Sequence, residues 1–288
     1  ELVENSLDAG ARRIDIHIEE GGHQRIRISD DGRGIPPDEL PLAIAPHATS
    51  KLARPEDLEA IGTMGFRGEA LASIASISRL RISSRALQSD GTLAESGYQL
   101  EASGAHVEPV VPVAMAAGTV VEVRDLFFNT PARRKFMRAP ATEFGHIDEI
   151  ITRIALVQHQ VSFTLTHGQR TTLAVTATDS RRQRCVDLLG AELEPALLEF
   201  EHIAAGPVTD ARPAARASNP GTSPEPASAI RIWGLAGLPR LARATAKFQY
   251  LCINGRPIRD RSLAHALKEA YRGLIPPDRQ PLAVVFID

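Results

Sequence analysis

The stretch ELVENSLDAGARRIDIHIEEGGHQRIRISDDGRGIP (residues 1–36) decides the fold that we expect for this chain. Apolar residues at positions 2, 3 and 7 share one face of a helix over residues 1–9, and Gly10 is suited to end it. Isoleucines then alternate with polar residues over 14–18 and 26–28, the period of two that is typical of strands. Because two glycines separate these runs, we expect a β-hairpin followed by a glycine-rich loop.

Outward from this stretch, the pattern predicts a mixture of helices and strands. We expect helices over 69–76 and 146–156, and strands over 79–85 and 120–123. Residues 45–68 carry Thr, Ser and Gly with little periodicity, and they predict a long mobile loop. The fold class that follows is α/β (α+β), with a largely antiparallel sheet.

A change in composition predicts two domains. The sequence turns polar around residues 176–184, so we expect domains at 1–178 and 179–288. Residues 204–229 hold five prolines among Ala, Ser and Gly, and we expect a disordered insertion there. Structure should resume at 230–233, and Ser262 is expected to cap a later helix.

Composition narrows the class of protein. Hydrophobic residues make up 43% and charged residues 24% of the 288 positions, which is ordinary for a globular protein with a real core. No apolar run approaches the roughly 20 residues of a membrane helix, so we expect no membrane contact. Two cysteines without a Cys/His cluster fit a reducing cytoplasm and no zinc site. The net charge of −2 means that nucleic-acid binding would need local basic patches.

The acidic face of the first helix is a candidate phosphate and metal site. Asn5 lies four residues after Glu1, so both side chains project from one side of the helix. An amide oxygen is a suitable ligand for Mg²⁺, and a carboxylate one turn away can polarise a water molecule. Taken alone, such a face is more often solvated surface.

Two glycine-containing motifs add to this candidate. In DDGRG (residues 30–34), glycines admit a flat ligand and an Asp carboxylate can accept from an exocyclic amine. One alternative is an ordinary Asp-Gly turn. A calcium-binding loop is excluded, because the acidic residue that an EF-hand loop needs later in the motif is missing. In GFRGEAL (residues 65–71), two glycines precede the start of a helix, and a helix N-terminus is a natural phosphate-binding site. The alternative is that these glycines serve only the turn. No Walker-type motif occurs, which excludes a P-loop NTPase.

These motifs, in this order, resemble the MutL family within the superfamily of ATPases that includes gyrase B, Hsp90 and histidine kinases. ELVENSLDAGA, DDGRGI, HATSK (residues 47–51) and GFRGEAL carry the superfamily likeness, and DLFFNTPARRKF (residues 125–136) selects MutL. The resemblance implies a Bergerat-type GHKL sandwich, followed by a domain similar to the second domain of ribosomal protein S5.

The resemblance also implies roles for single residues. Glu1 matches the general base, with Glu4 as the competing choice; Asn5 matches the Mg²⁺ ligand and Asp30 the carboxylate that reads adenine. Residues 45–68 match a lid that orders over ATP. The nucleotide-contact positions are Gly32, Gly34, Lys51, Gly65, Phe66, Arg67, Gly68 and Thr119.

Basic residues form two sets, and the resemblance favours DNA for the second. The first set is Arg133, Arg134, Lys135 and Arg138; the second is Arg240, Arg243, Lys247, Arg256, Arg259 and Arg261. Arg256, Arg259 and Arg261 fall in a polar turn, and we expect backbone contacts without sequence preference. For any one of these basic residues, a role as solvated surface explains its presence as well as DNA binding does.

The expected function is an ATP-driven matchmaker in mismatch repair, which couples a MutS-type mismatch sensor to a downstream endonuclease or helicase. The resemblance implies ATP and Mg as cofactors, a homodimer in the full protein, and a cytoplasmic, nucleoid-associated location in a bacterium. The alternative is a non-catalytic DNA-binding scaffold. The chain starts without Met inside a predicted helix, so we expect a fragment that barely hydrolyses ATP by itself.

Overall fold

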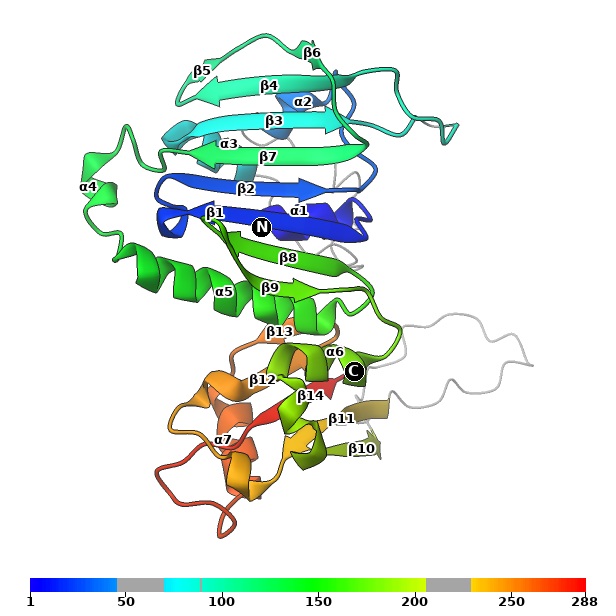
Figure 1. Cartoon of the computed structure of the whole chain (residues 1–288), viewed down its shortest axis with the longest axis vertical. Helices are drawn as coiled ribbons and strands as arrows, with labels where there is room; N and C mark the ends of the chain where they lie inside the picture. The colour runs from blue at the N-terminus through cyan, green and yellow to red at the C-terminus, as the bar shows by residue number, and fades with distance from the viewer. Residues whose placement is uncertain (46–69, 89, 206–228) are drawn as a thin grey trace, which may run out of the picture. The chain divides into compact units, whose positions relative to one another are not determined.

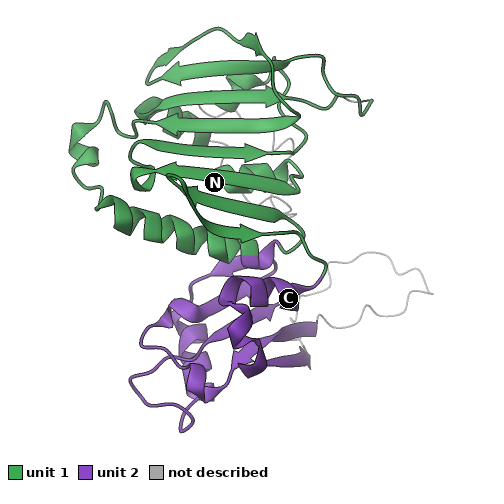
Figure 2. Ribbon diagram, in the orientation of Figure 1, with its two compact units in different colours: residues 1–155, 159–179 green, residues 156–158, 180–288 purple. Residues whose placement is uncertain are grey.

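The computed structural model describes residues 1–45, 70–88, 90–205 and 229–288 (Figure 1). The chain divides into two compact units (Figure 2). Unit 1 comprises residues 1–155 and 159–179, and unit 2 comprises residues 156–158 and 180–288.

Unit 1 is built on a mixed sheet that has nine strands in the described part of the chain, in the order β5-β4-β3-β7-β2-β1-β8-β9, with β6 paired to β4. The strands are β1 (Arg13–Glu19), β2 (Arg25–Asp30), β3 (Arg79–Arg85), β4 (Gly97–Ser103), β5 (His106–Val107), β6 (Val111–Val113), β7 (Gly118–Arg124), β8 (Ser162–His167) and β9 (Arg170–Val175). Only the β1–β8 pairing is parallel among them. The predicted α/β class with a largely antiparallel sheet is confirmed.

The predicted hairpin is present as β1 and β2, with Ile16 opposite Ile28. The isoleucines of β1 are fully buried, which explains why their alternation identified the strand. Gly21 in the connection has φ of 62°, and a Cβ there would lie 2.2 Å from the carbonyl oxygen of Pro140. The turn therefore requires glycine on two grounds, its left-handed backbone and the close approach of another segment.

Helices cover one face of this sheet, and α1, α2 and α3 lie behind the strands in Figure 1. Leu40 of α2 and Ala75 of α3 pack with Leu80, Ile82 and Leu100 of the sheet in one apolar cluster. The helices of unit 1 are α1 (Leu2–Asp8), α2 (Leu40–Ala43), α3 (Ala70–Ile77), α4 (Pro131–Arg134) and α5 (Pro140–Val157). The expected helix over 146–156 is thus longer and begins at a proline, which is favoured in a first helical turn.

Unit 2 holds a second sheet, with five strands in the residues described, ordered β10-β11-β14-β12-β13. Its elements are α6 (Arg181–Leu189), β10 (Leu197–Ala205), β11 (Ala229–Gly237), β12 (Gln249–Ile253), β13 (Arg256–Ile258), α7 (Arg261–Ala270) and β14 (Ala283–Ile287). Val186 of α6 packs on Leu235, Val284 and Phe286 in the core of this unit.

Two local predictions for unit 2 are wrong in detail. The cap of α7 is Asp260 rather than Ser262: Asp260 has extended backbone and its carboxylate accepts from the backbone N–H of Leu263 at 2.8 Å. The expected insertion at 204–229 is strand at both ends, because Ala205 pairs with Ala229 in the β10–β11 ladder. Residues 206–228 lie outside the described residues.

None of the helices in the described ranges combines the length and the apolar character that crossing a bilayer requires.

Candidate nucleotide site

A partly buried carboxylate, Asp30, is the centre of the candidate site. It ends β2, lies opposite Thr119 of β7, and receives a hydrogen bond from Ser6 of α1. The hydroxyl of Ser6 donates to Oδ2 at 2.7 Å, and the backbone N–H of Gly32 donates to Oδ1 at 3.0 Å. Three separate elements therefore hold one carboxylate in a fixed orientation.

Burial raises the pKa of Asp30 above its ordinary value of 3.8, because the charged form loses solvation. Hydrogen bonds from Ser6, Gly32 and Thr119 act in the opposite direction, and the charge of Asp31 adds to the increase. A carboxylate has about four lone-pair positions, so Asp30 can still accept from a ligand donor. An exocyclic amine is such a donor.

Next to Asp30 is a second polar group that the sequence analysis missed, Ser84 of β3. Its Oγ accepts from the backbone N–H of Ile35 at 2.7 Å and lies 3.0 Å from Oγ1 of Thr119. Both side chains are buried. The sequence does indicate that Ser84 is buried, because it follows Leu80 and Ile82 at the alternate positions of the strand that face the core. Ser6, on the buried face of α1 with Val3, is a similar omission.

Close packing explains the two glycines in the loop after β2. A Cβ on Gly32 would lie 2.9 Å from Cβ of Ala9, and one on Gly34 would lie 2.6 Å from the carbonyl oxygen of Arg85. Gly34 also has φ of 74°. Because the loop packs this closely on α1 and β3, glycine is explained at both positions without a ligand, and nucleotide contact there stays a prediction.

Helix α1 places Glu1 and Asn5 one turn apart, as predicted from their spacing. The carbonyl oxygen of Glu1 accepts from the backbone N–H of Asn5 at 2.8 Å. The side chain of Glu1 is 60% exposed, whereas Ser6, the neighbour of Asn5, is buried against Asp30. The same helix therefore carries the expected metal ligand and a partner of the expected adenine reader.

The remaining predicted contacts fall partly outside the structure. Thr119 lies beside Asp30, as described above. Lys51, Gly65, Phe66, Arg67 and Gly68 lie outside the described residues, as does most of the expected lid at 45–68.

The arginines predicted to bind DNA lie on and after an edge strand rather than in a polar turn. Arg256 begins β13 and pairs with Ile253 across a tight turn in which Asn254 and Gly255 have φ of 47° and 72°. Asn-Gly at such a turn is a strong hairpin signal, which the sequence analysis overlooked. Arg259 and Arg261 follow the strand and are exposed. Arg256 and Arg259 thus lie on and directly after the edge strand, and Arg261 begins α7.

Two known protein families match this chain, one in its N-terminal part and one in its C-terminal part. Residues 1–120 match the family described as histidine kinase-, DNA gyrase B- and HSP90-like ATPase. Residues 215–288 match the family described as DNA mismatch repair protein, C-terminal domain. Part of unit 1 is therefore similar to these ATPases, and part of unit 2 is similar to a domain of mismatch repair proteins.

Whole-chain comparisons agree. The chain is 45% identical to the DNA mismatch repair protein MutL of Pseudomonas paraeruginosa over 289 residues, which is 100% of this chain and 42% of that protein. MutL of Azotobacter vinelandii is also 45% identical, with 41% of its length covered. The chain spans about two fifths of the length of these curated relatives.

Solved structures give the same result. The Aquifex aeolicus MutL ATPase domain complexed with ADP is 28% identical, with a TM-score of 0.65, and the match covers 99% of this chain and 88% of that one. The N-terminal domain of a DNA repair protein has a TM-score of 0.78 at 24% identity, a likeness of fold alone. Its sequence, its fold and its relatives agree that this chain belongs to the MutL family of DNA mismatch repair proteins.

Proposed function

We propose that unit 1 binds ATP and, within the full protein, hydrolyses it. The single observation that carries this proposal is the partly buried Asp30 carboxylate, oriented by Ser6, Gly32 and Thr119, in a segment that matches an ATPase family. A partly buried acid with spare lone pairs fits the amino group of adenine, which donates and does not accept at that position. The Aquifex relative, which was solved with ADP, supports a nucleotide as the ligand.

Neighbouring residues complete the proposed site. Asn5 would hold Mg²⁺ through its amide oxygen, and the metal when bound would neutralise charge on the phosphates. Glu1, on the same side of α1 and exposed to water, is the proposed general base that polarises the attacking water. The further nucleotide contacts are proposed at Gly32, Gly34, Lys51, Gly65, Phe66, Arg67, Gly68 and Thr119.

We propose mismatch repair as the process in which the whole protein acts. ATP binding would close the chain into a homodimer that couples a MutS-type sensor to a downstream endonuclease or helicase. The extent of the match to two curated MutL proteins supports this role. The location that we propose is a bacterial cytoplasm, in association with the nucleoid. The functional domains are proposed to divide at residues 178 and 179.

Unit 2 is the proposed DNA-binding part. Arg256 begins the edge strand β13, Arg259 follows that strand, and Arg261 begins α7. Arg259 and Arg261 are exposed. Guanidinium groups without accompanying aromatic rings fit phosphates, so we propose backbone contacts without sequence preference.

Calorimetry with Mg²⁺ and a slowly hydrolysed ATP analogue tests the ATPase proposal. We expect saturable binding by the wild type and loss of binding in Asn5→Ala, because no other neutral amide lies on α1. Asn129→Ala is the matched control: Asn129 belongs to the same unit and its amide only donates to the carbonyl oxygen of Ser76. Equal affinity in wild type and Asn5→Ala would remove Asn5 from the site, and no binding at all would defeat the proposal.

A further inference from the structure

Strand β10 (Leu197–Ala205) forms one edge of the sheet of unit 2, and among the described residues it pairs with β11 alone. All nine of its residues pair with β11 in one unbroken antiparallel register. In such a pair, alternate residues direct their backbone N–H and C=O groups away from the partner strand. The outer side of β10 therefore presents a row of backbone donors and acceptors to any further strand.

The other edge strands in the described part of the chain have features that hinder pairing with a further strand. At the opposite edge of the same sheet, β13 has three residues, one of which is a proline. In unit 1, β5 has two residues, β6 has three with a central proline, and β9 pairs with β8 across a register shift. Short length, proline and irregular register all protect an edge. Strand β10 is long and regular and contains no proline.

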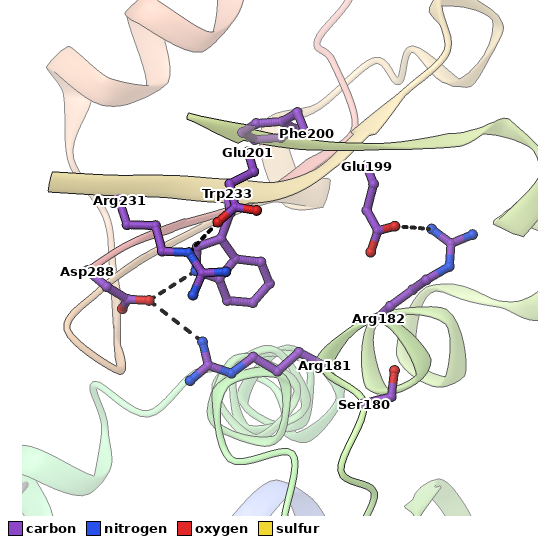
Figure 3. Close-up of a pocket in the computed structure, with 9 residues that line it drawn as sticks. All are labelled: Ser180, Arg181, Arg182, Glu199, Phe200, Glu201, Arg231, Trp233 and Asp288. Atoms are coloured by element: carbon purple, nitrogen blue, oxygen red, sulfur yellow. Dashed lines mark hydrogen bonds and ion pairs between the residues drawn. The ribbon is translucent and has the colours of Figure 1, made fainter. Parts of the chain in front are cut away.

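The two sides of β10 differ in chemistry. Glu199 and Glu201 project to one side, where Glu201 lies opposite Trp233 in the ladder and both acids border a cavity of about 630 Å³ at Trp233 (Figure 3). Phe200 points to the other side of the strand (Figure 3). Leu198 belongs to the same side as Phe200, because side chains alternate along a strand, and it is 55% exposed. The edge thus has an acidic side and an apolar side.

The two carboxylates are the groups of this cavity that stay accessible from the edge. The guanidinium of Arg231, from the neighbouring strand β11, lies over the ring of Trp233 and donates to Glu201 at 2.6 Å. Arg182 of α6 lies 3.9 Å from Glu199. Even so, the side chains of Glu199 and Glu201 are 66% and 51% exposed. A strand added beside β10 would have these two acids as its direct cross-strand neighbours.

We propose that β10 receives an extended segment of a partner protein in which basic residues alternate with apolar ones. The segment extends the sheet by one strand through main-chain hydrogen bonds. Its basic side chains lie beside Glu199 and Glu201, and its apolar side chains lie beside Leu198 and Phe200, because opposite charges and apolar pairs are favoured across neighbouring strands. This inference goes beyond ATP and duplex binding and rests on neither.

A second copy of this chain matches the edge less well. Full antiparallel overlap of β10 with its own copy centres on residue 201, the middle of the strand. Glu201 would then lie directly opposite Glu201 of the copy, and like charges in that position are unfavourable. The two acids therefore disfavour self-pairing and favour a strand of opposite charge.

Fluorescence anisotropy with a labelled peptide of four Lys-Val repeats tests the proposal on the 288-residue chain. We expect saturable binding at low salt, and much weaker binding of a block peptide with four lysines followed by four valines. Two further peptides carry N-methyl groups on all lysine amides or on all valine amides. One of these two should lose at least roughly tenfold in affinity and the other should bind nearly normally, because only alternate N–H groups face the edge.

Amide hydrogen exchange locates the bound peptide. Alternate amides of β10 should exchange rapidly in the free chain and become protected when the Lys-Val peptide is added, whereas the short edge strand β13 should not change. Glu199→Gln should weaken peptide binding by roughly 1.5- to fivefold, the range for one cross-strand charge pair. Glu192→Gln is the matched control, because Glu192 is an exposed acid of the same unit that precedes the strand.

Four results would overturn the inference. The first is equal affinity for the alternating and the block peptides, and the second is equal affinity of wild type and Glu199→Gln for the alternating peptide. The third is protection of all β10 amides in the free chain, which would mean that the edge is already covered. The fourth is a dimer of the free chain in sedimentation that Leu198→Lys abolishes, which would assign the edge to a second copy.

Discussion

Replacing Asp30 by asparagine changes the hydrogen-bonding groups that this partly buried position offers to a base, with almost no change in shape. The carboxylate accepts from Ser6 and Gly32 and can accept from an adenine amine. Asparagine keeps one acceptor oxygen but turns an N–H₂ group toward the ligand. We therefore expect the variant to prefer inosine triphosphate, whose base has a carbonyl where adenine has its amine.

The size of the effect follows from the hydrogen bond involved. A hydrogen bond to a charged group contributes about 1.5–3 kcal/mol, which corresponds to roughly a 10- to 150-fold change in dissociation constant. Wild type should favour ATP over inosine triphosphate by this factor, and Asp30→Asn should lose or reverse the preference. The Ser6 hydroxyl can rotate to accept from the new amide, so the variant should fold, with a loss of about 1–2 kcal/mol.

The pH dependence of stability provides a second readout. Burial raises the pKa of Asp30, so the folded protein holds this proton more tightly than the unfolded chain does. The stability that this bound proton contributes to the folded state is fully present below the ordinary pKa of 3.8. It is lost as the pH rises through the pKa of Asp30 in the folded protein. Asparagine does not titrate, so the Asp30→Asn variant does not lose stability in this way as the pH rises. Urea unfolding at several pH values should show the wild type falling relative to the variant as pH rises.

Calorimetry with both nucleotides checks the base preference, with Asp31→Asn as the control. Asp31 accepts from the backbone N–H groups of Arg12 and Arg13 at 2.8 Å each, and an asparagine oxygen there can still accept. Asp31→Asn should keep the wild-type preference for ATP. An unchanged ratio of the two affinities in Asp30→Asn would refute the role of Asp30 in reading the base.

Three further outcomes are expected. In the full protein, Glu1→Ala should bind ATP yet lose roughly 10²- to 10⁴-fold in turnover, the usual effect of removing a positioned base; a larger kinetic effect of Glu4→Ala would make Glu4 the base. Charge reversal at Arg256, Arg259 and Arg261 should weaken duplex binding to all sequences and reduce the log–log salt slope by about 0.9 per lost phosphate contact; an unchanged slope would move the DNA site elsewhere. Burial raises the pKa of the Cys185 thiol to about 12, so a thiol reagent at neutral pH should label Cys185 only on unfolding, and rapid labelling of the native chain would contradict its burial.

The elements that were predicted from the sequence are those that local periodicity specifies. The β1–β2 hairpin could be read because its alternating isoleucines and its glycine pair are adjacent in the chain. Helix α1 and its end at Gly10 were readable for the same reason, and Gly10 has the positive φ of 76° that a helix stop requires. The α7 cap was misplaced by two residues because Asp260 and Ser262 are both good caps, and only the backbone distinguishes them.

By itself the sequence determined the family, the helices and strands with clear periodicity, and the residue types proposed for a nucleotide site, because these are carried by contiguous motifs such as DDGRG. Only the tertiary structure decided which groups surround Asp30. Ser6 and Thr119 reach it because α1 packs on the sheet and because β7 pairs with β2 in one register. The cavity at Trp233 is likewise invisible in the sequence, since strand pairing places Phe286 beside the indole. The physical reason is that strand register and helix packing are set by burial summed over whole elements, and no local motif encodes which distant residue will lie opposite.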